Sequence, residues 1–282
     1  MKTINLCSLV VICVGFAFFA TSCANENEVA TDATLTLTAT DEALASSLSD
    51  EVINEAELYS NTLADLGYNS AMAVKGNAEA SKPTVTVNKK DSVNFPKVIT
   101  IDYGLGTIVH GDTLKGQIII TISDKSWKPG STKTVKLVNF YVNSNHIKGI
   151  KIITTNALNA AKNPSVTFTV SDTIIRADKS TVIRNSTRTR ERISDGGTPR
   201  IYSDDKFSIT GNSNGINAKN VAYTVEITKA LILYNDFRFF VSGTVTTKIK
   251  DKTIVLDYGD GTKDNKATIT VNGVKKEITL KN

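Results

Sequence analysis

The stretch Ala267-Thr-Ile-Thr-Val-Asn-Gly-Val-Lys-Lys-Glu-Ile-Thr-Leu280 decides the fold class of this chain. Two β-rich runs flank Asn272-Gly273, and an Asn-Gly pair in this position is the strongest short-range signal of a β-hairpin. Similar short runs, rich in β-branched and aromatic residues, follow one another from Pro83 onward. No helical pattern separates them. Strands this close together favour antiparallel meanders over a parallel sheet.

The other candidate strands share this composition. They are Val98–Tyr103, Gln117–Ser123, Lys133–Val142, Ile147–Thr154, Val166–Val170, Thr181–Ile193, Lys206–Thr210, Val221–Ala230, Phe237–Ile249 and Thr253–Tyr258, before Ala267–Val271 and Val274–Leu280. Gly, Asn and Asp fill the turns between them, as left-handed backbone positions require. We therefore predict a mostly β domain over 83–282: an antiparallel meander forming a sandwich or a barrel-like sheet.

One segment before this domain has the periodicity of a helix. Its apolar residues recur at three- and four-residue spacing, at Leu44, Leu48, Val52, Ala56, Tyr59, Leu63 and Leu66. Asp41 or Thr40 is the expected N-cap, and Gly67 ends the pattern. The opposite face is acidic, whereas membrane-surface helices are normally basic there. We predict an N-terminal amphipathic helix over 41–67 that docks on the sheet.

The first 22 residues have the layout of a secretory signal. Lys2 is basic, Leu6 to Ala20 are apolar, and small residues precede Cys23. The apolar run is shorter than the ~20 residues with which a helix spans a bilayer. The sequence Ala20-Thr-Ser-Cys23 resembles the bacterial lipobox, whose cysteine is lipidated, for example with palmitate, after cleavage. Ordinary cleavage without lipidation is the alternative. We predict that Cys23 anchors the protein in the outer membrane.

The residues that follow the anchor bear on location. Residues 23–40 are polar and Thr-rich, which predicts a flexible tether, and residues 76–82 have the composition of a linker. Glu26 and Glu28 resemble the signal that exports Bacteroidota lipoproteins to the cell surface. An ordinary solvated tether explains these two glutamates equally well. A periplasmic and a surface-exposed location therefore both stay open.

Composition excludes several classes of function. Of the three cysteines, processing removes Cys7 and Cys13 and lipid blocks Cys23, so no thiol nucleophile, disulfide or cysteine metal ligand is left. A net charge of +5 on 282 residues does not suggest nucleic acid. His110 and His146 lie in separate turn-like segments, without Asp or Glu at ligand spacing. No catalytic motif is present, and we expect no cofactor and no metal.

The densest basic feature is a row of four arginines in the run Val182–Ile193. Arg184, Arg188, Arg190 and Arg192 are spaced so that a strand places all of them on one face. Such a row can bind sulfate, phosphate or carboxylate groups bidentately, and so an anionic ligand. The alternative is a strand paired with acidic residues on its neighbours.

Three weaker features allow a second interpretation. Asp257, Asp260 and Asp264 surround glycines, which suggests calcium, but the spacing is not that of an EF-hand and a structural turn is the preferred interpretation. Phe237, Phe239 and Phe240, with Tyr234 and Val241, are expected in the core, and an exposed aromatic platform for sugars is the alternative. Trp127, before Pro129-Gly130, either stacks on a sugar or packs over the end of a sheet.

An internal echo relates two parts of the chain. Ile99-Thr-Ile-Asp-Tyr-Gly-Leu-Gly-Thr107 is similar to Ile254-Val-Leu-Asp-Tyr-Gly-Asp-Gly-Thr262. The two copies mark either two similar subdomains or one hairpin type used twice. The intervening runs do not align well, which slightly favours the second interpretation.

Residues 94–282 resemble an uncharacterised family of Bacteroidota cell-envelope lipoproteins. The resemblance is carried by Phe95-Pro-Lys-Val-Ile-Thr-Ile-Asp-Tyr-Gly104, Ser186-Thr-Arg-Thr-Arg190, Val241-Ser-Gly-Thr-Val245, Asp257-Tyr-Gly-Asp-Gly-Thr262 and Asp264-Asn-Lys-Ala-Thr-Ile-Thr-Val-Asn-Gly273. Many members have a cysteine near Asn235 or Asp236 and another near Lys263. This chain has neither, so that cross-link is absent. The resemblance implies a lipoprotein with a β fold and implies no activity.

Together these observations predict a non-enzymatic lipoprotein of the outer membrane. Its β domain would bind a glycan, an envelope component or a protein partner. An enzyme acting on polysaccharide is the alternative, because paired catalytic carboxylates come from distant strands and leave no local pattern. A purely structural envelope protein is the third hypothesis.

Overall fold

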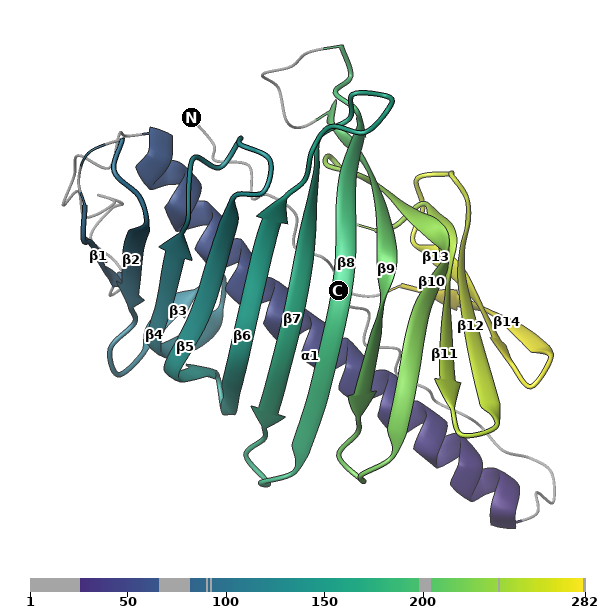
Figure 1. The fold of residues 1–282 in the computed structure, drawn as a ribbon. Helices are drawn as coiled ribbons and strands as arrows, with labels where there is room; N and C mark the ends of the chain where they lie inside the picture. The colour runs from purple at the N-terminus through teal and green to yellow at the C-terminus, as the bar shows by residue number, and fades with distance from the viewer. Residues whose placement is uncertain are drawn as a thin grey trace.

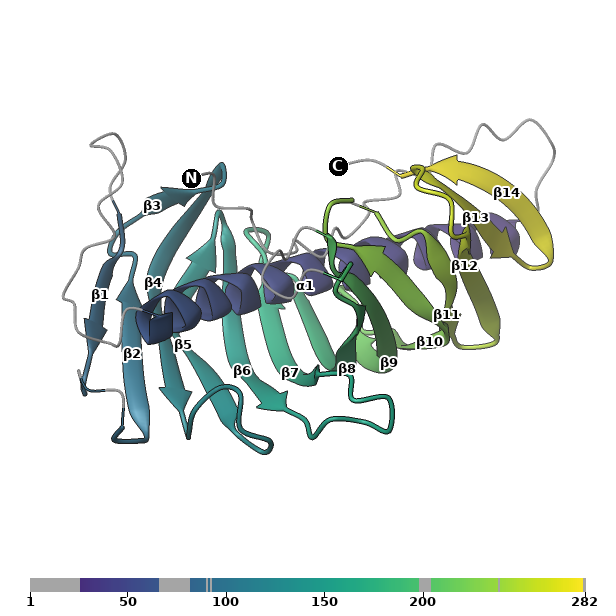
Figure 2. The same cartoon turned by 90° about the horizontal axis from the view of Figure 1, so that it is seen from above.

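A computed structural model describes residues 26–65, 82–89, 91, 93–197, 204–237 and 239–280, with side chains of the first segment described from 33 to 64. These residues form one long helix and one fourteen-stranded antiparallel sheet (Figure 1). The sheet curves around the helix, which crosses its concave face diagonally (Figure 2). The predicted mostly β meander with an N-terminal helix is confirmed. The sheet is single and open, so it is neither a sandwich nor a closed barrel.

The elements follow one another along the chain as one helix and then strands only. They are α1 (Glu26–Asp65), β1 (Thr84–Val87), β2 (Lys97–Asp102), β3 (Thr107–Val109), β4 (Asp112–Ile122), β5 (Thr132–Val142), β6 (Asn145–Thr155), β7 (Ser165–Ile175), β8 (Thr181–Ser194), β9 (Lys206–Ile216), β10 (Ala222–Tyr234), β11 (Ser242–Ile249), β12 (Lys252–Asp260), β13 (Lys266–Val271) and β14 (Val274–Thr279). Every predicted strand overlaps one of these. The prediction missed β1 and β3, which are too short to show a period-two pattern.

Each strand pairs with the next in sequence, except that β2 pairs with β4 and the short β3 pairs with the other end of β4. Tight turns make this order possible. At the predicted hairpin, Asn272 and Gly273 have φ values of 50° and 82°, and Val271 pairs with Val274 across the turn. Positive φ at both central residues is what a type I′ hairpin needs.

The helix is longer than its apolar pattern predicted. It begins at Glu26, so the predicted flexible tether over residues 23–40 is helical where the structure describes it, and the predicted N-cap Asp41 lies within the helix. Threonine hydroxyls of Thr38 and Thr40 bond back to backbone carbonyls one turn earlier, which makes this segment a weak helix former by itself. Contact with the sheet compensates: Leu35 is buried against side chains of β10 to β13.

The structure describes the helix almost to its predicted end. Asp65 is the last helical residue, whereas Leu66, Gly67 and the predicted linker over 76–81 lie outside the described residues. The signal segment and Cys23 also lie outside them. Within the part of the chain that the structure describes, no helix is long and apolar enough to cross a membrane.

The largest core lies between the helix and strands β2 to β5. Leu48, Val52 and Ala56 of α1 pack there against isoleucines of β2 and β4 that have no solvent exposure, Ile99, Ile101, Ile118 and Ile120. Aliphatic side chains at alternate positions of both strands face the helix, as the period of two requires. We call this part of the concave face, over β2 to β5, the apolar region.

Candidate functional site

The arginine row lies on the concave face of β8, beneath the helix. Arg184 is 1% exposed, and Arg188, Arg190 and Arg192 are partly buried on the same face. Residues of opposite parity, such as Glu191, lie on the convex face, where Glu191 accepts hydrogen bonds from Asn159 and Asn163. The arginines therefore share one face, as their spacing predicted, but that face is covered.

Carboxylates of the helix pair with the row. Arg184 donates from Nε to Glu42 Oε1 at 2.9 Å, and Arg190 Nη2 lies 3.3 Å from Glu57 Oε2. Arg188 lies 3.9 Å from both Glu42 and Asp50. These acids were expected on the solvent face of the helix, and for this group that expectation is wrong. Buried arginines need counter-charges. The helix supplies them for Arg184, Arg188 and Arg190, whereas Arg192 lies 3.8 Å from Asp205, just before β9.

A second buried ion pair lies on the neighbouring strands β6 and β7. Lys151 of β6 donates to Asp172 Oδ1 of β7 at 2.7 Å, and Ser49 of α1 donates to the other oxygen at 2.5 Å. Both charged side chains are at most 1% exposed. Burial lowers the pKa of Lys151, and the Asp172 carboxylate opposes this change. We call the joint set the ionic seam: Glu42, Asp50, Glu57, Lys151, Asp172, Arg184, Arg188 and Arg190.

Glycines make room for the ionic seam within the sheet. Asp172 and Arg184 are cross-strand partners. Across the neighbouring strands, Gly149 of β6 pairs with Asp172, and Gly215 of β9 pairs with Arg184. A Cβ on Gly149 would lie 2.5 Å from Asp172 Oδ1, and one on Gly215 would lie 2.5 Å from the Tyr223 hydroxyl oxygen. That hydroxyl donates to Glu42. Side chains at either glycine would displace groups that the buried charges need.

One carboxyl of the ionic seam has an unusual pKa. Burial raises the pKa of Asp50 to about 6, although the guanidinium groups of Arg188 and Arg184 oppose the change. Its Oδ2 is buried and accepts no hydrogen bond within the described residues. Ionised Asp50 is thus stabilised by the charges of Arg188 and Arg184 and by a hydrogen bond from Ser46. Among the described residues, the ionic seam is a largely buried network whose charges pair with one another.

The aspartates of the proposed calcium loop are engaged in local turns. Asp257 accepts a hydrogen bond from the Gly259 amide, and Asp260 accepts bonds from the amide and hydroxyl of Thr262. The first copy of the internal echo has the same arrangement, since Asp102 accepts from the Gly104 amide. The echo is therefore one local turn at two places in a continuous sheet.

The two tyrosines of the echo complete this motif. Tyr103 and Tyr258 are both buried, and each meets a phenylalanine edge-on, Phe140 at 5.8 Å and Phe240 at 5.2 Å between ring centroids. Phe240 thus lies in the core, as predicted. In each copy, the turn places the tyrosine in the core, and the buried ring holds the turn against the sheet.

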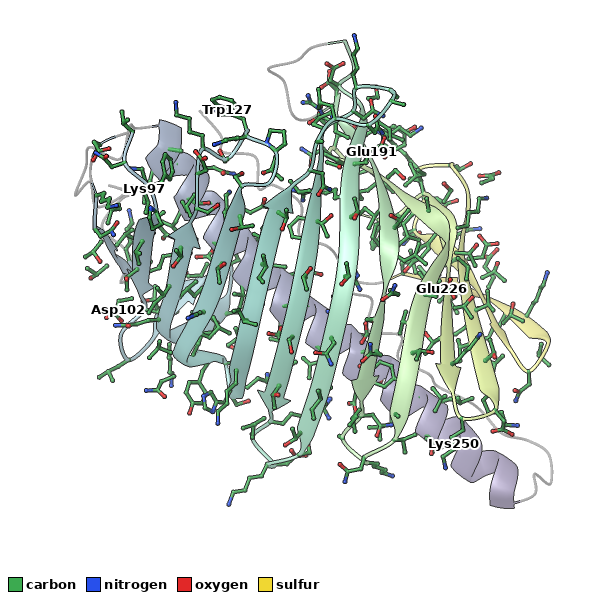
Figure 3. All side chains as sticks on the ribbon, viewed as in Figure 1. Lys97, Asp102, Trp127, Glu191, Glu226 and Lys250 are labelled. Carbon is green, nitrogen blue, oxygen red and sulfur yellow. The ribbon has the colours of Figure 1, made fainter. Side chains whose placement is uncertain are left out.

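Trp127 lies at the edge of the sheet where the β4–β5 and β6–β7 loops project (Figure 3). Its side chain is 74% exposed, so it does not pack over the end of the sheet, and Lys125 lies over its ring at 5.6 Å. Leu158 of the β6–β7 loop is 60% exposed. The Thr155 hydroxyl joins the two loops by donating to the Ser126 carbonyl at 2.7 Å. We call this surface the loop rim.

A small cavity of about 160 Å³, lined by both polar and aliphatic side chains, lies under the loop rim. Ser126, Ser131 and Thr155 of the loops and strand ends line it, together with Glu57 of α1 and Lys133 of β5. Burial lowers the pKa of Lys133, whose ammonium group donates to Asn61 of α1 at 2.8 Å. Enclosed ligand sites are usually about 300–1,000 Å³, so this cavity suits the end of a longer ligand.

His110 meets two glutamates that the sequence analysis did not connect with it. His110, in the β3–β4 turn, lies beside Glu51 and Glu55 of α1, so the expectation that no acidic residue lies near it is wrong. The spacing of the two glutamates, four residues apart in a helix, was the available signal. Burial and the Glu55 carboxylate raise the pKa of Glu51, and burial raises that of Glu55. His146 is stacked on Tyr141 instead.

Comparison with family models, with curated proteins and with solved structures finds no match to this chain. The resemblance to a Bacteroidota lipoprotein family stays a prediction. Function must therefore be argued from the sequence and the geometry.

Proposed function

We propose that this protein is a lipid-anchored lipoprotein of the outer membrane that binds a glycan or an envelope protein without catalysis. The observation that carries the proposal is the position of helix α1. It begins three residues after Cys23 and then runs across the whole concave face. A lipid on Cys23 would hold the first turn of α1 at the membrane surface, and the buried contacts of α1 would fix the sheet relative to it.

The charge distribution near the start of α1 supports this orientation. Leu35 packs beside Tyr223 and Ile249, so the β9–β10 and β11–β12 turns lie near the start of the helix. Lys248 and Lys250 are exposed there, and Figure 3 shows Lys250 at the edge opposite Trp127. Lysines near an anionic membrane surface each contribute about 1 kcal/mol to attachment.

The same orientation directs the loop rim away from the membrane. Trp127 is exposed in the loop whose Ser126 lines the cavity, and an exposed indole near hydroxyl groups is a suitable surface for a sugar ring. The concave face is filled by α1, which favours binding at the rim over binding inside the sheet. We propose the loop rim as the binding surface.

Anchoring is tested by Cys23→Ala. We expect this variant to leave the membrane fraction or to accumulate as unprocessed precursor, because it has no acyl chain. Metabolic labelling with a palmitate analogue measures this directly, followed by membrane fractionation. Equal labelling of the variant and the wild type would contradict the lipid anchor.

Binding is tested on a glycan array with the full chain and with Trp127→Ala. We expect the variant to lose most of the array signal, whereas Leu105→Ala serves as a matched control. Leu105 is 97% exposed but follows β2, away from the loop rim. Mass spectrometry of bound glycans after incubation distinguishes a binding protein from an enzyme, because cleaved products would indicate an enzyme. If the array gives no signal, the proposed ligand is an envelope protein, and crosslinking on intact cells tests for it.

A further inference from the structure

Glu51, Glu55 and His110 form a group of metal-ligating side chains away from the loop rim. One ligand atom from each residue lies within 4.8 Å of the other two. The two glutamates are one helical turn apart on α1, so both carboxylates project from one face of the helix. His110, whose φ is 51°, reaches them from the turn between β3 and β4.

One oxygen of this group has no hydrogen-bond partner among the described residues. Glu51 Oε1 is buried, and His110 Nδ1 lies 3.9 Å from it. A buried carboxylate oxygen that accepts no hydrogen bond is costly, so native structures usually provide a partner. A cation between Glu51 and His110 would supply it.

The local charge also favours a cation. The charged groups that act on Glu51 are the carboxylates of Glu55 and Asp112 and the imidazole of His110. Three carboxylates thus lie at this site beside one histidine. No lysine or arginine of the described residues pairs with these carboxylates in an ion pair. The excess negative charge matches a divalent ion.

A neighbouring hydrogen bond holds one ligand in place. The Tyr103 hydroxyl donates to Glu55 Oε2 at 2.5 Å. Burial and the Glu55 charge raise the pKa of Tyr103 well above its usual value, so the hydroxyl keeps its proton and stays a donor. Hydrogen bonds of this kind orient metal-ligating carboxylates, and each carboxylate keeps a second oxygen for the ion.

The donor set indicates the type of ion. Imidazole nitrogen together with carboxylate oxygen suits Zn²⁺ and related transition metals, whereas Ca²⁺ and Mg²⁺ prefer oxygen alone. Bonds of about 2.0–2.2 Å place neighbouring ligands of a tetrahedral ion roughly 3.3 Å apart. The separation of 3.9 Å between Nδ1 and Oε1 needs only a small side-chain movement to reach that value.

We propose that Glu51, Glu55 and His110 bind a divalent transition-metal ion, with Zn²⁺ the best fit and water completing its coordination. The ion joins the middle of α1 to the β3–β4 hairpin. Since this geometry exists only in the folded chain, binding stabilises the fold. The site is independent of the lipid anchor and of the loop rim.

The test uses the full chain, purified from membranes without a polyhistidine tag and treated with a chelator that is then removed. Isothermal titration with ZnCl₂ measures affinity and stoichiometry, and Co²⁺ substitution reports tetrahedral coordination by visible absorption. We expect one ion per chain and a rise of several degrees in melting temperature with excess zinc. Asn tolerates positive φ, so His110→Asn keeps the turn and should weaken binding at least tenfold.

His146→Asn is the matched control, because it changes the other histidine of the chain and lies outside the group. We expect it to bind zinc as the wild type does. Glu51→Gln, whose side chain is partly exposed, provides a second ligand variant and should also weaken binding at least tenfold. The proposal is overturned if the wild type binds no zinc at 100 μM, or if both histidine variants bind equally well.

Discussion

The concave face of the sheet holds the helix in two different ways. Over β2 to β5, in the apolar region, isoleucines of the sheet meet leucine, valine and alanine of α1. Over β6 to β9, in the ionic seam, the same helix meets buried charges such as Arg184 and Asp172. Apolar contact is non-directional and tolerates sliding, whereas paired charges fix direction and spacing.

This difference suggests a division of roles along α1. The apolar region removes aliphatic surface from water and so contributes most of the favourable free energy of docking. Buried ion pairs contribute little net free energy, because desolvation offsets their attraction. Arg184, Arg188 and Arg190 of the sheet pair with particular carboxylates of α1, however, and a shift of α1 by one residue would leave several of these charges unpaired. We infer that the ionic seam sets the register of the helix on the sheet.

The largest expected effect is that of Asp172→Ala. Removal of this carboxylate leaves Lys151 buried without its counter-ion and should lower the free energy of unfolding by about 3–5 kcal/mol. Urea denaturation followed by circular dichroism measures the loss. A loss below about 1 kcal/mol would show that the pair is not buried as the structure has it.

The double variant Lys151→Met/Asp172→Leu sharpens that test. With both charges removed, the Ser49 hydroxyl loses Asp172 as its acceptor and donates instead to the Ala45 carbonyl, 2.8 Å away, so it is not left unpaired. The double variant should therefore be more stable than Asp172→Ala, by at least 1 kcal/mol. Helix register is then checked by hydrogen exchange of α1. Unchanged protection along the whole helix would show that the hydrogen bond from Ser49 to Asp172 does not hold α1 in register.

A smaller loss is expected in the apolar region. Ile118 of β4 has no solvent exposure and belongs to the core beneath α1. Ile118→Ala creates a cavity and should cost about 2–4 kcal/mol, the usual range for such truncations. Ile118→Val, which removes one methylene, is the control and should cost about 1 kcal/mol. Thermal or urea unfolding measures both, and equal losses for the two variants would show that the site collapses around the change.

The apolar region was predictable from sequence, and the ionic seam was not. The helix pattern from Leu44 to Leu63 and the alternation in Val98–Tyr103 each depend on neighbouring residues alone. The spacing of the arginines correctly placed them on one face. Which face of the sheet is covered depends on where α1 docks. No local pattern encodes the pairing of Arg184 with Glu42, 142 residues away.

The same limit explains the other errors. Thr-rich residues 26–40 are weak helix formers, so their helix depends on contacts with β10 to β13 that come much later in the chain. Glu51, Glu55 and His110 likewise converge only after the β3–β4 hairpin folds back over the helix. A turn could be predicted where its own residues determine its conformation, as at Asn272-Gly273.

The smallest expected effect concerns anion binding by the arginine row. Exposed guanidinium groups would bind heparin at low salt and release it as salt screens the charges. Because Arg188 and Arg190 face the helix and its carboxylates, Arg188→Ala/Arg190→Ala should elute from a heparin column at the salt concentration of the wild type. Lys248→Gln/Lys250→Gln removes two exposed charges instead and should elute earlier. Circular dichroism confirms that each variant is folded. Earlier elution of the arginine variant than of the lysine variant would show that the row reaches an external anion, and the two regions of the concave face would then differ in exposure as well as in chemistry.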